Sequence, residues 1–146
     1  MKRIFIFALV LVTTGSFRLS DPGNNGILKE KDKITENFEK TFPGVSNVAW
    51  FKQDDGMKAV IEQGDIKTHI TYDSEGKVQK SMRFYPCKHL PAYVRAKVYE
   101  KYPSCQVTGV TESFLANDLT YQINITEGDK IIILNSDAVG NLTKIK

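Results

Sequence analysis

The stretch that decides the fold is residues 57–76, MKAVIEQGDIKTHITYDSEG. Apolar and polar residues alternate on both sides of Gly64-Asp65, and this dipeptide is a signal for a two-residue hairpin turn. Asp73 and Gly76 follow, and both residue types favour a turn that contains a left-handed residue. The stretch therefore predicts a β-hairpin with one covered face and a turn into a further strand.

The same features recur 64 residues later, in residues 121–140, YQINITEGDKIIILNSDAVG. The Gly-Asp dipeptide returns at 128–129, and the Asp-x-x-Gly turn returns at 137–140. Two copies of one supersecondary unit in a chain of 146 residues indicate a binding scaffold rather than an active site.

Apolar residues at four-residue spacing predict two helices, over residues 33–41 and 90–101. The dipeptides that end them, Phe42-Pro43 and Tyr102-Pro103, lie 60 residues apart, so the second copy contains a four-residue insertion. We place the insertion in the hairpin at 111–118, which should therefore be longer than its counterpart in the first copy.

Eight short strands complete the pattern, four after each helix. They are expected at residues 45–52, 57–63, 66–72, 78–85, 106–114, 119–127, 130–135 and 141–146. One helix with a four-stranded antiparallel meander, roughly 50 residues, buries too little apolar surface to be robust alone. We therefore expect an α+β fold in which two such tandem units form one sheet of up to eight strands, with both helices on one face and the other face open.

The first 16 residues have the features of a secretory signal peptide. Lys2 and Arg3 precede an uncharged run that is shorter than the ~20 apolar residues needed to span a bilayer. Small residues follow the run, so cleavage is expected near Gly15 or Ser16. The pattern predicts a periplasmic or secreted protein.

Residues 17–31 combine Pro, Gly and alternating charges, which predicts a flexible leader. The remaining chain divides into a first unit at 32–86 and a second unit at 87–146. Loss of Lys2 and Arg3 lowers the formal net charge from +3 to +1. A nearly neutral chain without a Lys/Arg stripe argues against nucleic acid as the main partner.

Cys87 and Cys105 are the only cysteines. A straight helix between them spans ~18 Å, whereas bridged Cα atoms lie within about 7 Å. A disulfide would require the flanking loops to fold back, and the sequence leaves free and bridged states open. His69 and His89 are the only histidines, the spacing of a zinc site is absent, and no cofactor is expected.

The acidic turns admit a calcium site with Asp73, Glu75 and Asp137 as candidate ligands. The alternating acids of a full calcium loop are absent, and turn chemistry alone explains these residues. His69 could act as a general base, yet no Ser or Cys is placed to form a dyad with it. We expect no enzymatic activity and no catalytic residue.

Aromatic residues on strands are candidates for a partner site, because Trp and Tyr are enriched among binding hot spots. Neighbouring strand residues point to opposite faces, so one of Trp50 and Phe51 should face the helices. Trp50 is either a core residue or an interface anchor. Our candidate partner-binding residues are Trp50, Tyr72, Phe84, Phe114 and Tyr121.

The turn and helix-end motifs are together similar to those of a known family. They are Phe42-Pro43-Gly44, Asn47-Val48-Ala49-Trp50, Tyr72-Asp73 with Gly76, Leu90-Pro91 with Val94, Tyr102-Pro103, Tyr121, and Asp137 with Gly140. Over residues 32–146 the chain resembles the beta-lactamase-inhibitor-like, PepSY-like family of small exported bacterial proteins. The resemblance implies tandem PepSY-like units and a periplasmic or secreted protein, in a family largely without an established activity. The chain departs from the pattern at Ser104-Cys105, where the second copy lacks the glycine of Pro43-Gly44.

The leading hypothesis is a non-enzymatic periplasmic or secreted binding module, without an integral membrane span, that holds a protein or peptide on the open sheet face. One alternative is a protein inhibitor of a hydrolase, such as a beta-lactamase or a protease, that acts through the 111–118 hairpin with its Phe114-Leu115. Another is a calcium-responsive envelope protein. The sequence leaves the partner and the oligomeric state open.

Overall fold

The computed structural model describes residues 25–146, and their side chains from residue 33 onward. The signal peptide expected at 1–16 and the first part of the expected leader lie outside the described residues. The helices are α1 (Asn25–Thr41) and α2 (Ala92–Lys101), with a 3-10 turn η1 (Cys87–His89) before α2. The strands are β1 (Val48–Lys52), β2 (Met57–Gln63), β3 (Ile66–Tyr72), β4 (Val78–Tyr85), β5 (Gln106–Leu115), β6 (Asp118–Glu127), β7 (Lys130–Asp137) and β8 (Leu142–Lys144).

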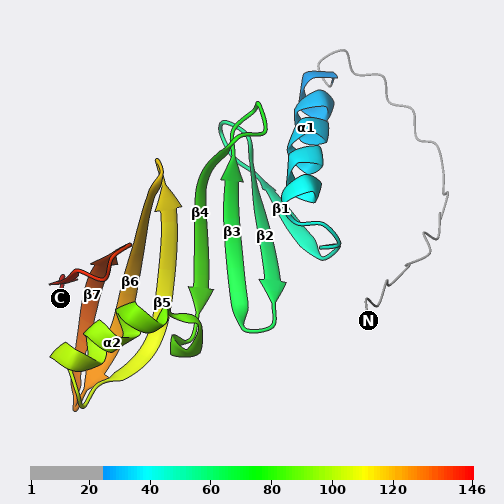
Figure 1. Cartoon of the computed structure of the whole chain (residues 1–146). Coiled ribbons are helices and arrows are strands. Elements are labelled where there is room, and N and C mark those ends of the chain that lie inside the picture. Colours follow the sequence, from blue (N-terminus) through cyan, green and yellow to red (C-terminus); the bar gives the residue numbers. More distant parts are fainter. Residues whose placement is uncertain (1–24) are drawn as a thin grey trace, which may run out of the picture.

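The strands form one eight-stranded sheet in chain order, and every neighbouring pair is antiparallel (Figure 1). The first unit consists of α1 with β1–β4, and the second of α2 with β5–β8. The α+β class and the two helix-plus-meander units expected from the sequence are confirmed.

The insertion in the second unit lengthens strands rather than a turn. Strands β5 and β6 have 10 residues each, against 5 for β1 and 7 for β2. Only Ala116 and Asn117 separate β5 from β6, at φ 51° and 66°. Two successive left-handed residues form the tight turn that matches the right-handed twist of the strands.

Helix α1 begins earlier than the sequence predicted. It starts at Asn25, so residues 25–31, expected to belong to a flexible leader, are helical. This start could not be predicted from apolar periodicity, because Gly26 and the alternating charges supply no apolar stripe. At the other end, Gly44 is left-handed at φ 81°, and the helix stops at Thr41 as expected.

Both helices cover the same face of the sheet. Residues directly opposite in an antiparallel sheet share a face, and Ile70 pairs with Ser81, which pairs with Phe114. The core under α1 includes Ile70 and the core under α2 includes Tyr121, whose pairing with Glu112 places it on that same face. The arrangement predicted from the sequence is therefore correct.

Two hydrophobic cores lie beneath the helices rather than one. Ile34 and Phe38 of α1 pack on the first unit, and Val94 and Val98 of α2 pack on the second. Polar residues separate the two cores on this face: Thr68, Ser81, Arg83 and Glu112. The Tyr85 hydroxyl donates a hydrogen bond to the Glu112 carboxylate at 2.7 Å, and Arg83 forms an ion pair with the same carboxylate at 3.2 Å. The polar residues between the two cores are therefore held by hydrogen bonds and an ion pair.

The two Asp-x-x-Gly turns have the same construction. An Asp73 carboxylate oxygen accepts from the backbone N–H groups of Glu75 and Lys77. An Asp137 oxygen accepts from those of Val139 and Asn141 in the same way. Each turn therefore uses the carboxylate of its aspartate to fix its own backbone.

Candidate functional site: the open sheet face

The second face of the sheet is covered by neither α1 nor α2. Three rows of side chains cross it, each built from residues that lie opposite one another on successive strands. The first row is Phe51, Lys58, Thr71, Lys80, Leu115 and Asp118. The second row is Ala49, Val60, His69, Met82, Ser113, Thr120 and Asp137. The third row is Glu62, Lys67, Phe84, Thr111, Gln122, Asn135 and Thr143.

Three of the aromatic candidates lie on the helix-covered face, so their expected placement on the open face is wrong. Trp50 is half-buried and packs its ring 5.3 Å from that of Phe38, edge to face. Tyr72 is 1% exposed in the same core, and Tyr121 is 3% exposed in the core of the second unit. Strand alternation places Phe51, not Trp50, on the open face, at 47% exposure.

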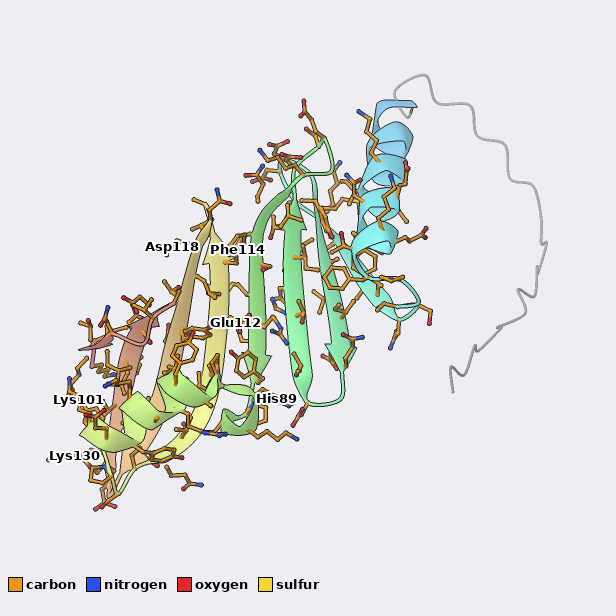
Figure 2. All side chains as sticks on the ribbon, viewed as in Figure 1. His89, Lys101, Glu112, Phe114, Asp118 and Lys130 are labelled. Carbon is orange, nitrogen blue, oxygen red and sulfur yellow. The ribbon has the colours of Figure 1, made fainter. Side chains whose placement is uncertain are left out.

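The other two candidates lie on different faces. Phe84 is on the open face, half-buried, with its ring 4.9 Å from that of His69 in an edge contact. Phe114 is 42% exposed on the helix side, because it pairs with Ser81. Figure 2 shows Phe114 near the tip of the β5–β6 hairpin. The five candidates therefore do not form one site.

The half of the open face that belongs to the first unit combines apolar and basic side chains. We define the basic-apolar patch as Phe51, Lys58, Val60, His69, Lys80, Met82 and Phe84. Val60, Met82 and Phe84 are half-buried among their neighbours. Lys58 lies over the Phe51 ring, 5.1 Å from its centroid.

Two of the three charged groups that shift the pKa of His69 are lysines, Lys58 and Lys67. Desolvation lowers the pKa of His69, and the charges of Lys58 and Lys67 lower it further. Glu62 opposes this effect and pairs with Lys67 at 2.9 Å. The Nε2 atom of His69 is buried without a hydrogen-bond partner. These conditions favour the neutral imidazole, which adds to the apolar character of the row.

The other titratable candidates are used in local structure. His89 Nε2 lies 2.7 Å from an Asp65 oxygen, and Lys88 pairs with the other oxygen. Burial raises the pKa of the Cys105 thiol, and Cys87 lies 3.8 Å from the Tyr99 hydroxyl. Both thiols are free.

Among the side chains that the structure describes, residues 33–146, no cluster of three or more His, Cys, Asp or Glu could hold a metal ion. The calcium candidates Asp73 and Asp137 belong to separate turns, after β3 and β7. Both Asp73 oxygens already accept hydrogen bonds, one of them from Gln79. None of the described helices is long and apolar enough to cross a membrane.

Sequence reasoning missed most of the patch. The signal was present in the alternation of β2, where Ala59 and Ile61 are covered and Lys58 and Val60 therefore face outward. Counting outward positions rather than aromatic residues would have identified the patch.

No protein-family model matches the sequence, and no curated protein matches it. A BLIP-like protein from Bacteroides fragilis NCTC 9343 shares its fold with a TM-score of 0.62 at 16% identity, over 78% of this chain and 85% of that one. A DUF2874 family protein from Bacteroides ovatus ATCC 8483 has a TM-score of 0.60 at 15% identity, over 77% and 86%. A candidate periplasmic protein from Bacteroides eggerthii DSM 20697 has a TM-score of 0.59 at 13% identity, over 78% and 88%. The chain therefore has the beta-lactamase-inhibitor-like fold of these small bacterial proteins.

Proposed function

We propose that this protein is a non-enzymatic periplasmic binding module that holds a protein partner on the open face of its sheet. The observation that carries the proposal is the uncovered face itself, which bears exposed Phe51 beside half-buried Val60, Met82 and Phe84. Apolar side chains gathered on one exposed face are typical of interaction surfaces.

The location in the periplasm is supported by the signal-peptide features of residues 1–16 and by the candidate periplasmic neighbour. The absence of enzymatic activity is supported by the site chemistry of the described residues. His69 packs on Phe84, His89 is paired with Asp65, and neither is bonded to a nucleophile. A general base requires hydrogen-bond reach to the group that it activates.

The test blocks the centre of the face with bulky, uncharged, strand-compatible residues. Thr111 and Ser113 lie on β5, directly opposite Phe84 and Met82. We expect the double variant Thr111→Tyr/Ser113→Tyr to fold normally. The amount of partner that it captures from an envelope extract should fall about tenfold relative to the wild type. Matched controls are Val78→Tyr and Val139→Tyr, which enlarge exposed residues away from this face. Undiminished capture by the double variant, with loss in either control, would refute the proposal.

A second candidate is a hydrolase inhibitor that acts through the β5–β6 hairpin. This hairpin exposes Leu115 at 53% and Phe114, and it extends beyond the end of β7, since the pairing of β6 with β7 stops at Thr120. One neighbour is described as BLIP-like. A Phe114→Ala/Leu115→Ala variant should lose any inhibition that the native protein shows against beta-lactamases or proteases. Lack of inhibition by the native protein removes this candidate.

A further inference from the structure

We propose that the partner presents an acidic, partly apolar segment of polypeptide and that the basic-apolar patch of the first unit binds it. The inference rests on the proposed function and adds which half of the face engages and what chemistry it recognises. Carboxylates of the segment would face Lys58 and Lys80, and an apolar side chain would cover Val60, Met82 and Phe84.

The two units provide an internal comparison, because β2 and β3 pair in the same register as β6 and β7 at the 64-residue offset. Lys58 pairs with Thr71 in the first unit, and Gln122 pairs with Asn135 in the second. The same comparison aligns Lys67 with Ile131, His69 with Ile133, Val60 with Asn124 and Glu62 with Thr126. Lys80, opposite Thr71, corresponds to Thr143, opposite Asn135. The scaffold therefore does not require charge at these positions, since its own second unit is uncharged there.

The two lysines are available to a partner. Lys58 and Lys80 lie on either side of Thr71, two strands apart. Neither makes an ion pair within residues 33–146, whereas Lys67 on the same face is paired with Glu62. The nearest acid in their row is Asp118, on β6 beyond Leu115. Unpaired cations that flank an apolar strip are complementary to carboxylates that flank an apolar side chain.

A protein segment fits these features better than a phosphate polymer or a lipid surface. Only two free ammonium groups face outward here, and on the adjoining half of the face the paired strands carry the acids Asp118 and Asp137 and no lysine or arginine. Nucleic-acid and anionic-membrane sites use larger clusters of basic residues. Half-buried apolar side chains inside a polar rim are the usual anatomy of a protein interface.

The test selects binders from a random displayed peptide library on the intact protein. We expect the selected peptides to be enriched in Asp and Glu beside an aromatic or aliphatic residue. Lys58→Gln/Lys80→Thr installs the residues of the second unit, and it should weaken the selected peptides about tenfold. The matched control Lys33→Gln/Lys52→Gln removes the same charge from residues away from this face, one on α1 and one opposite Met57, and should leave affinity unchanged.

Each other outcome contradicts the inference in a recognisable way. Selected peptides without acidic enrichment would overturn the inference and leave the proposed function intact. The same holds if the peptides keep full affinity for Lys58→Gln/Lys80→Thr but lose affinity for Thr111→Tyr/Ser113→Tyr. Peptides that are indifferent to both variants count against the proposed function as well. A library that yields no binder overturns the inference, as does binding to phosphatidylglycerol vesicles that depends on Lys58 and Lys80.

Discussion

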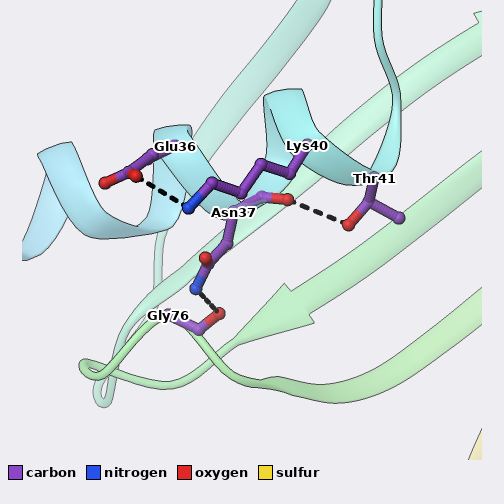
Figure 3. A network of polar contacts seen from close by, with 5 residues as sticks. All are labelled: Glu36, Asn37, Lys40, Thr41 and Gly76. Carbon is purple, nitrogen blue, oxygen red and sulfur yellow. Dashed lines mark hydrogen bonds and ion pairs between the residues drawn. The ribbon is translucent and has the colours of Figure 1, made fainter.

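The side-chain amide of Asn37 donates a hydrogen bond to the backbone carbonyl of Gly76 at 2.9 Å, which ties α1 to the turn between β3 and β4 (Figure 3). Gly76 is left-handed at φ 83°, and a Cβ there would lie 2.9 Å from the Asn37 amide nitrogen and 3.3 Å from the Lys33 carbonyl. Gly140, at the same place in the second unit, is also left-handed and packs against Tyr93 and Lys97 of α2. The close approach of the turn to the helix therefore requires glycine at position 76. At position 140 a Cβ would lie 3.5 Å from the Tyr93 side chain, an ordinary contact, so only the left-handed backbone favours glycine there.

We expect Gly76→Ala to lower the free energy of unfolding by about 2–4 kcal/mol, because left-handed strain adds to overpacking against α1. Gly64→Ala is the matched control, since Gly64 is left-handed at φ 62° but a Cβ there meets nothing within 4 Å. It should cost only the strain, about 1–2 kcal/mol. Urea denaturation measures both. Equal losses would show that the contact with α1 is unimportant.

Trp50→Ala should be strongly destabilising, by about 2–4 kcal/mol, because the ring packs against Phe38 and Tyr72 in the core of the first unit. Phe51→Ala, on the next residue but the open face, should change stability by only about 0.5 kcal/mol. Thermal melting separates the two variants. If Trp50→Ala melts like the wild type while Phe51→Ala unfolds, the assignment of faces in β1 is wrong.

Tyr72→Phe and Tyr85→Phe remove the same atom with opposite expected results. The Tyr72 hydroxyl is buried without a hydrogen-bond partner, and burial raises its pKa to about 12. Removing it should leave stability unchanged or raise it by up to about 1 kcal/mol. The Tyr85 hydroxyl donates to Glu112 at 2.7 Å, and its loss should cost about 1–2 kcal/mol. Chemical denaturation distinguishes these results, and a destabilised Tyr72→Phe would mean that its hydroxyl has a partner.

The ion pairs of Asp65 should make stability depend on pH in the acid range. Lys88, and then His89, lower the pKa of the Asp65 carboxyl from 3.8 to about 2. Since the folded pKa lies below the unfolded one, this stabilisation is present above pH 3.8 and is lost as the pH falls toward 2. The difference in melting temperature between wild type and Asp65→Asn should therefore be largest above about pH 4, should shrink as the pH falls toward 2, and should vanish only below about pH 2.

Asp129→Asn controls for this measurement, because Asp129 is the equivalent of Asp65 at the 64-residue offset and makes no ion pair within residues 33–146. Its melting difference should stay small at every pH. If the melting-temperature difference between wild type and Asp65→Asn stays unchanged down to pH 2, the ion pairs of Asp65 with Lys88 and His89 do not stabilise the fold.

The repeated turns made the fold predictable from the sequence. Gly-Asp and Asp-x-x-Gly fix the hairpins through backbone chemistry that needs no tertiary information, and the structure has the turns at those positions. The start of α1 at Asn25 was missed because its first turns carry no apolar stripe.

The candidate site was harder to predict, for two different reasons. Tyr72 and Tyr121 share the alternation phase of Ile70 and Ile123, so their burial could have been read from the sequence. Trp50 and Phe51 are adjacent aromatic residues, so the sequence pattern does not show which one is covered. The packing of Trp50 in the core beneath α1 decides it. The separate faces of Phe84 and Phe114 depend on the pairing register of β4 with β5, which forms across the two units.

Covalent side-chain footprinting of the protein with and without a bound display-selected peptide is the most direct test of binding on the open face. We expect the peptide to protect Phe51, Met82 and Phe84 from labelling and to leave Val78 and Phe114, on the helix side, unchanged. Protection of Val78 and Phe114, with Phe51, Met82 and Phe84 labelled as in the free protein, would contradict binding on the open face.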